Sequence, residues 1–182
     1  HPERFDPAGY PHNTAAECIV FAYEEGNRAG VLNGIFCQPG DLAQLDSNQV
    51  NTLVLPPLTY APQEITDRIK LLHDQGINLV CFEDAGALAS VFGVKRRDRG
   101  ARIDRVRRVD GGLARQVLAG VSELDVEHAG TVRDLRYALA GGTPLLACID
   151  EAGAPIGPAL VLNQGANART LLWTTPPTDI SR

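Results

Sequence analysis

The chain has 182 residues and a mass of 19.5 kDa, which suits a single domain. Hydrophobic residues make up 44% and charged residues 21%, a globular balance that argues against a disordered chain. No apolar run exceeds about six residues, which is too short for a transmembrane helix. The net charge of −5 disfavours a generally basic nucleic-acid binder, while leaving room for a local basic patch.

Cysteine usage predicts a reducing, cytoplasmic setting. Cys18, Cys37, Cys81 and Cys148 lie far apart without a CxxC pair, so we expect buried thiols rather than a zinc site or a disulfide framework. No signal-peptide pattern follows His1. The chain also lacks methionine, from which we expect a domain cut from a longer polypeptide.

The first half has the pattern of parallel strands alternating with helices. Strands that are nearly continuous in apolar character, as in a sheet buried on both faces, are predicted at 18–23, 51–55 and 77–82. Helices are predicted at 27–36 and 62–75. The short connections favour a right-handed parallel crossover.

The helix predicted at 62–75 is the clearest element. Its core face carries Ile65, Ile69 and Leu72. Arg68 falls on the other side, where it forms a favourable i, i+4 pair with Glu64. We therefore expect Arg68→Ala to change stability by well under about 1 kcal/mol.

The second half changes character. Residues 95–108 hold eight basic and two acidic side chains, a net of +6, which leaves −11 for the rest of the chain. A helix is predicted at 111–121, with Leu113, Val117, Leu118 and Val121 on its apolar face. An antiparallel meander of short strands is predicted after it, at 145–149, 159–162 and 171–174. The predicted fold is an α/β class, a three-layer, flavodoxin-like parallel sheet with an antiparallel C-terminal extension.

The expected domain organisation is simple. Prolines at 2, 7 and 11 predict an N-terminal strap or linker at 1–16. A single α/β domain is expected at 17–178, followed by a tail at 179–182.

The residues at the carboxyl ends of two predicted strands, where a ligand crevice is expected, are weak candidates for catalysis. Cys81, Glu83 and Asp84 lie at the end of a predicted parallel strand, and Glu24 and Glu25 follow another; the carboxyl ends of such strands are where α/β sheets bind ligands. Cys81 has bulky neighbours and acidic residues after it, so we expect a buried, inert thiol. Adjacent carboxylates point in different directions, which favours solvated or ion-paired roles over an acid/base dyad. No catalytic residue is therefore predicted.

Other chemistries lack a motif. No histidine spacing typical of a metal site occurs, and no glycine-rich phosphate loop follows the first predicted strand. We therefore predict no metal and no cofactor.

The basic segment 95–108 points to contact with acidic surface. It holds seven arginines to one lysine and no aromatic residue, so single-stranded nucleic acid has no stacking platform there. Arg105, Arg107 and Arg108 are the candidate interface residues. Their partner is the same chain, a sister subunit in a dimer or trimer, or the rest of a parent polypeptide; a solvated loop is the alternative. No membrane or nucleic-acid partner is expected.

The order of these elements resembles the class I glutamine amidotransferase-like fold, and more closely the β-galactosidase trimerisation domain of multidomain glycoside hydrolases. The stretches that carry the likeness within 17–178 are 53–60 (LVLPPLTY), 76–80 (GINLV), 89–94 (ASVFGV) and the closing hairpin from 159 to 177. The nucleophile elbow and the late His-x-Glu pair of active amidotransferases are absent.

The resemblance implies a scaffold without glutaminase chemistry. It predicts a non-catalytic accessory domain, for oligomerisation or for shaping a neighbouring active site, within a larger carbohydrate-active enzyme such as a β-galactosidase-like glycoside hydrolase. A stand-alone hydrolase and a small-ligand-binding module on the same fold are the alternatives, since one fold hosts many functions.

Overall fold

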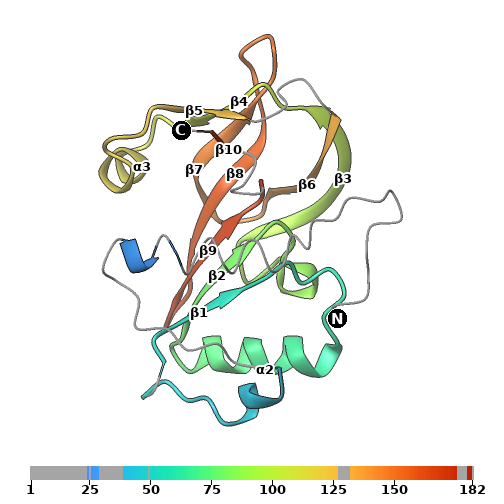
Figure 1. The fold of residues 1–182 in the computed structure, drawn as a ribbon, viewed down its shortest axis with the longest axis vertical. Coiled ribbons are helices and arrows are strands. Elements are labelled where there is room, and N and C mark those ends of the chain that lie inside the picture. The colour runs from blue at the N-terminus through green and yellow to red at the C-terminus, as the bar shows by residue number, and fades with distance from the viewer. Residues whose placement is uncertain are drawn as a thin grey trace.

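The structure, a computed structural model, describes residues 24, 26–28, 39–48, 50–126, 132–175 and 180–181, without the side chains at 98–99, 132–135 and 180–181 (Figure 1). The expected strap at 1–16, the expected strand at 18–23 and most of the expected helix at 27–36 lie outside these ranges. None of the helices in the described ranges is long and apolar enough to cross a membrane.

Ten described strands form one large sheet and one ribbon. The sheet has the order β1-β2-β9-β8-β7-β4-β5-β10, and β3 pairs with β6 in the ribbon. The strands are β1 (Thr52–Leu55), β2 (Asn78–Phe82), β3 (Val94–Arg102), β4 (Arg105–Arg108), β5 (Glu123–Val126), β6 (Val132–Leu139), β7 (Thr143–Ile149), β8 (Pro155–Gln164), β9 (Arg169–Trp173) and β10 (Ile180–Ser181). The helical segments are η1 (Pro39–Ala43), α2 (Gln63–Asp74), η2 (Gly86–Leu88) and α3 (Gly112–Val117).

Three neighbouring strands make the parallel part of the sheet. Cys81 in β2 lies opposite Leu55 in β1 and Leu172 in β9, in parallel register. These side chains are buried in one core with Ile69 and Leu72 of α2. The predicted parallel pairing of β1 and β2, with α2 between them in the chain, is therefore confirmed.

The rest of the sheet is antiparallel. The predicted meander is confirmed as β7, β8 and β9, and the long β7–β8 hairpin runs along the long axis of the molecule (Figure 1). A second core lies on this side, around Val106, Leu146 and Cys148. Ile180 and Ser181, in the expected tail, pair with β5 as β10.

The predicted three-layer, flavodoxin-like parallel sheet is wrong. In the described ranges only β1, β2 and β9 run parallel, and the architecture is a mostly sheet, mixed and curled half-barrel with few helices. Residues 95–108, for which no strand was predicted, form most of β3 and all of β4. Arginines flank the buried Val106 of β4, so the charge concealed the alternation of a strand.

Helix α3 is shorter than predicted, and its face is different. It ends at Val117 instead of 121, and the expected core residues Leu113 and Val117 are 41% and 56% exposed. Ala114 is the α3 residue that packs in the second core. The apolar spacing along this segment was therefore a poor guide to its orientation.

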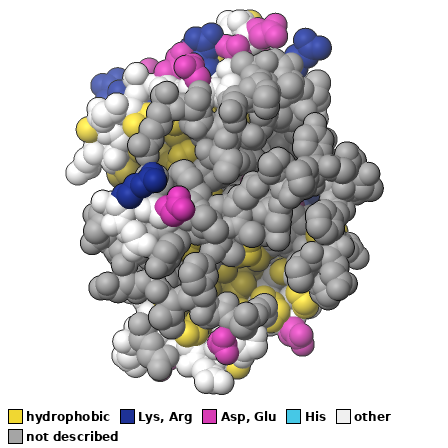
Figure 2. Space-filling model, viewed as in Figure 1, with side chains coloured by type: hydrophobic (Ala, Val, Ile, Leu, Met, Phe, Trp, Pro, Cys, Tyr) yellow, Lys and Arg dark blue, Asp and Glu magenta, His cyan; other side chains and the backbone are white. Residues whose placement is uncertain are grey.

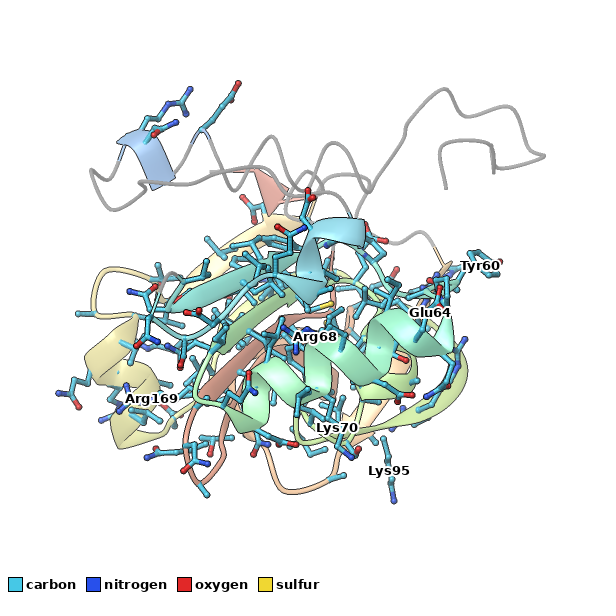
Figure 3. All side chains as sticks on the ribbon, turned by 90° about the horizontal axis from the view of Figure 1, so that it is seen from below. Tyr60, Glu64, Arg68, Lys70, Lys95 and Arg169 are labelled. Atoms are coloured by element: carbon cyan, nitrogen blue, oxygen red, sulfur yellow. The ribbon has the colours of Figure 1, made fainter. Side chains whose placement is uncertain are left out.

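Arg68 of α2 (Figure 3) contacts the backbone at the end of η1, an interaction that its predicted surface position did not indicate. Its guanidinium donates hydrogen bonds to the backbone oxygens of Leu42 at 2.8 Å, Ala43 at 3.1 Å and Leu45 at 2.8 Å. These carbonyls lie at the end of η1 and just after it, where a helix leaves its last acceptors without internal partners. These three hydrogen bonds, the Arg68 clamp, hold η1 against α2 and stand in place of the expected pairing with Glu64.

We predict that both faces of α2 matter for stability. Ile69→Ala removes a side chain that is 1% exposed and should cost about 2–5 kcal/mol. Arg68→Ala leaves three carbonyls without a charged donor and should cost about 1.5–3 kcal/mol, more than sequence reasoning allowed. Urea unfolding measures both, with Lys70→Ala as the matched control, because Lys70 is exposed on the same helix. A loss at Arg68 no larger than at Lys70 would contradict the clamp.

Candidate functional site

The candidate site lies where the parallel strands β1, β2 and β9 end. Beyond β2 the chain turns sharply: Glu83 has a φ of 60°, in the left-handed region, and its N–H donates to the Trp173 oxygen at 2.6 Å. The Asp84 N–H donates to Phe82 at 2.7 Å, and the Asp84 carbonyl accepts from Leu58 at 2.6 Å. This turn carries the Asp84 carboxylate into the interior.

Asp84 is fully buried, and both of its carboxylate oxygens are engaged. Oδ1 accepts hydrogen bonds from the Tyr137 hydroxyl at 2.5 Å and the Gly86 N–H at 2.9 Å. Oδ2 accepts from the Thr59 hydroxyl at 2.8 Å and from Arg136 at 3.0 Å. Arg96 Nη1 lies 3.6 Å from the same Oδ2. One carboxylate therefore joins the loop after β1, the turn after β2 and both strands of the β3–β6 ribbon.

Tyr137 is the other fully buried polar group of this cluster. Its hydroxyl donates to Asp84 and accepts the N–H of Ala85 at 2.9 Å. Gly86 closes the turn with a φ of 52°, and a Cβ there would lie 2.5 Å from the Leu58 oxygen, so glycine is required.

The contacts set the ionisation of both groups. Burial alone would raise the pKa of Asp84, but the hydrogen bonds from Tyr137, Gly86 and Thr59, together with the charge of Arg136, lower it below its usual value. Burial and the neighbouring carboxylate raise the pKa of Tyr137 well above its usual value. Asp84 is thus held as an anion whose acceptor positions are filled, which suits an ion-pair centre rather than a general base.

The other predicted crevice residues do not assemble into a catalytic set. Cys81 is fully buried, as expected, with its sulfur 3.6 Å from the Asp84 carbonyl and 3.7 Å from that of Pro56. Its lack of reactivity stays a prediction. Glu24 is exposed, and Glu25 lies outside the described residues. Within the described ranges no group of three or more His, Cys, Asp or Glu is placed to hold a metal ion.

The candidate interface arginines lie on one end of the sheet. Arg105 contacts Asp104 at 2.6 Å and Glu123 at 2.8 Å, and Arg107 contacts Glu123 at 3.0 Å. Arg108 donates instead to the Leu118 carbonyl at 2.9 Å. Figure 2 shows acidic and basic side chains gathered at this end of the molecule. Hydrogen bonds from Arg105 and Arg107 lower the pKa of Glu123.

Sequence reasoning found Asp84 but missed the residues that define its role. These residues come from three separate segments, with Thr59 after β1, Arg96 in β3, and Arg136 and Tyr137 in β6. Tyr137 lies 53 positions from Asp84. The one available signal was Asp84 itself, a carboxylate directly after a buried strand. Its partners depend on how the β3–β6 ribbon folds back, which no local pattern specifies.

Comparison with known proteins finds similarity at the level of the fold. No protein-family model and no curated protein matches the chain. Exo-β-1,4-mannosidase Op5Man5 from Opitutaceae bacterium strain TAV5 is similar over 96% of this chain and 29% of its own, with 16% identity and a TM-score of 0.59.

Two β-galactosidases are similar as well. Those from Rahnella sp. R3 and Bacillus circulans sp. alkalophilus match over 72% and 74% of this chain, with 16% and 12% identity and TM-scores of 0.53 and 0.55. The chain spans 21% of each of these two proteins and less than a third of the mannosidase. At such identities the likeness establishes the fold alone, which the chain shares with part of each of these glycoside hydrolases. The amidotransferase-like and flavodoxin-like descriptions are not supported.

We predict that Asp84 supports stability in a pH-dependent way. Because its pKa is lowered on folding, its contribution is present above the unfolded-state pKa of about 4 and is lost as the pH falls through the folded-state value. Asp84→Asn leaves two guanidinium groups without their carboxylate and should cost about 3–5 kcal/mol at pH 7. The difference from wild type should shrink at pH 3.

Urea unfolding at the two pH values measures this difference. Asp110→Asn is the control, because Asp110 is 92% exposed and its replacement should change stability by less than about 0.5 kcal/mol. A loss for Asp84→Asn that is the same at pH 3 and pH 7 would show that the ionised carboxylate is not the cause.

Proposed function

We propose that the chain is a non-catalytic accessory domain of a larger carbohydrate-active enzyme, of the kind related to β-galactosidases, where it serves oligomerisation or shapes a neighbouring active site. One observation carries the proposal: a domain-sized segment of a mannosidase shares the fold over 96% of this chain while making up 29% of that protein. A part of that size is expected of one domain in a multidomain protein.

The candidate site supports this function over a stand-alone hydrolase. A hydrolytic carboxylate must reach the substrate or a water molecule, whereas the oxygens of Asp84 are buried and already accept four hydrogen bonds. Cys81 is equally sequestered. These groups fit the interior of a scaffold.

The proposed partners are the remainder of the parent polypeptide and further copies of the chain. The charged end with Arg105 and Arg107 is the proposed contact surface, since both side chains remain more than 40% exposed beside their internal carboxylates. Arginine is well suited to such contacts because it can bind carboxylates bidentately. A cytoplasmic setting, without nucleic-acid or membrane partners, belongs to the same proposal and is favoured by the buried thiols of Cys81 and Cys148.

The test uses the natural polypeptide that contains this chain. We expect it to hydrolyse a chromogenic β-galactoside or β-mannoside, and the 182-residue chain alone to hydrolyse neither. Replacing Arg105, Arg107 and Arg108 by Ser should lower the sedimentation mass or the glycosidase activity of the natural polypeptide.

Glu123→Gln is the matched control. It weakens the ion pairs that Arg105 and Arg107 make with Glu123 but keeps the arginines, so an interface role predicts that it leaves mass and activity unchanged. Equal effects of the two variants would show that the arginines act only within the fold. Salt-sensitive oligonucleotide binding that the arginine variant abolishes, with unchanged mass, would replace the proposal by a nucleic-acid role.

A further inference from the structure

A groove lies at the opposite end of the parallel strands from Asp84. It has a volume of about 520 Å³ and opens where β1, β2 and β9 begin, beside the turn between β8 and β9. Figure 3 shows Arg169, which starts β9, at the far end of the molecule from Tyr60, which follows β1. The groove is therefore separate from the Asp84 cluster, and nothing in the proposed scaffold role uses it.

Its polar rim consists mainly of groups that can both donate and accept. The side chains of Gln164, Asn167 and Arg169 are exposed at the turn, and Thr52 adds a hydroxyl. Within the described part of the chain, neither the Gln164 amide nor the Arg169 guanidinium has a hydrogen-bond or ion-pair partner. The Oδ1 atom of Asn167 is likewise without a donor in those ranges. These groups are available to a ligand.

The turn that carries the rim is fixed in place. Asn167 Nδ2 donates to the Asp74 carbonyl at 3.0 Å, and the Arg169 N–H donates to Asn78 Oδ1 at 2.9 Å. The Gly165 N–H closes the turn on the Ala168 carbonyl at 2.9 Å. A Cβ at Gly165 would lie 3.1 Å from that carbonyl oxygen and 3.3 Å from His73 Nε2, so the turn packs tightly on the end of α2. Groups held in this way lose little freedom on binding.

The floor of the groove is apolar. Val80, Leu162 and Leu171 line it and are partly exposed. A lining with an apolar floor and a few positioned polar groups is typical of a small-molecule site.

The chemistry of the lining points to a ligand class. A carboxylate or phosphate would gain from Arg169 and could accept from the Gln164 amide, but it could not donate to the Asn167 Oδ1 atom, which is held as an acceptor because Asn167 Nδ2 bonds the Asp74 carbonyl. A neutral polyol presents hydroxyls that donate and accept in turn, together with C–H faces that can lie on the apolar floor. We infer that the groove is a binding subsite for a neutral saccharide. This inference rests on the proposed function, whose enzyme would supply such a ligand.

Binding should be weak, since the groove is open and the described residues of its lining include no aromatic ring for the sugar to stack on. We expect dissociation constants of about a millimolar or above. A subsite of that strength would hold a saccharide near the parent enzyme without competing with its active site.

The experiment is a titration of the ¹⁵N-labelled 182-residue chain with lactose, mannobiose or galacturonate, followed by backbone amide shifts. Lactose or mannobiose should shift the amides of Gly165, Asn167 and Arg169 in a saturable way. The double variant Gln164→Ala/Arg169→Ala, which removes no hydrogen bond or ion pair made by either side chain within the described ranges, should weaken binding at least about fivefold. Lys70→Ala, an exposed cation on α2, should bind as the wild type does.

Each outcome decides the inference. Absence of saturable shifts, or equal binding by the double variant, would overturn it. Galacturonate binding more than about tenfold tighter than either neutral sugar would assign the groove to an anion instead. The proposed function is tested separately by the glycosidase activity of the natural polypeptide, so failure of one does not imply failure of the other.

Discussion

The placement of the β3–β6 ribbon depends on one buried carboxylate, that of Asp84, which contacts three segments that lie far apart in the sequence. Asp84 binds Thr59 after β1, the turn at Gly86 after β2, and Arg136 and Tyr137 in β6, with Arg96 of β3 nearby. Burying a charge is costly unless it is paired and fully hydrogen-bonded. The β3–β6 ribbon therefore has to lie where its arginine and tyrosine reach the carboxylate.

This constraint places the β3–β6 ribbon against the first of two cores. One core packs α2 on the parallel strands, and the other lies among the antiparallel strands around Val106 and Cys148. Tyr137 belongs to the first core although its strand is antiparallel. The apolar packing supplies most of the stabilisation, while the directional bonds to Asp84 determine how the ribbon is placed against the sheet.

The sequence predicted local elements well and their assembly poorly. The strand at 77–82, the helix at 62–75 and the closing meander follow from apolar periodicity and turn residues, which act over short distances. The strands β3 to β6 were not predicted, and in β4 the reason is that arginines at partly exposed positions hid the alternation around Val106. The sequence could identify Asp84 as a carboxylate at a strand end, but its partners at 136 and 137 are set by tertiary contacts alone.

The same contrast applies to function. Cys81 and Asp84 were candidates because of their place at the end of β2, and their burial now supports a scaffold role. The groove at the other end of the strands was not foreseen, since Gln164, Asn167 and Arg169 have no motif in common and become neighbours only through the β8–β9 turn.

Native-state hydrogen exchange at pH 7 and pH 3 tests the central role of Asp84 most directly. At pH 3 the Asp84 carboxyl is largely protonated once the ribbon opens, whereas the closed ribbon favours its anion, so opening of the ribbon should become easier relative to opening of β7 and β8, which do not depend on this charge. We therefore predict that amide protection in β3 and β6 falls at pH 3 relative to protection in β7 and β8. A uniform change in protection across all four strands would contradict the account.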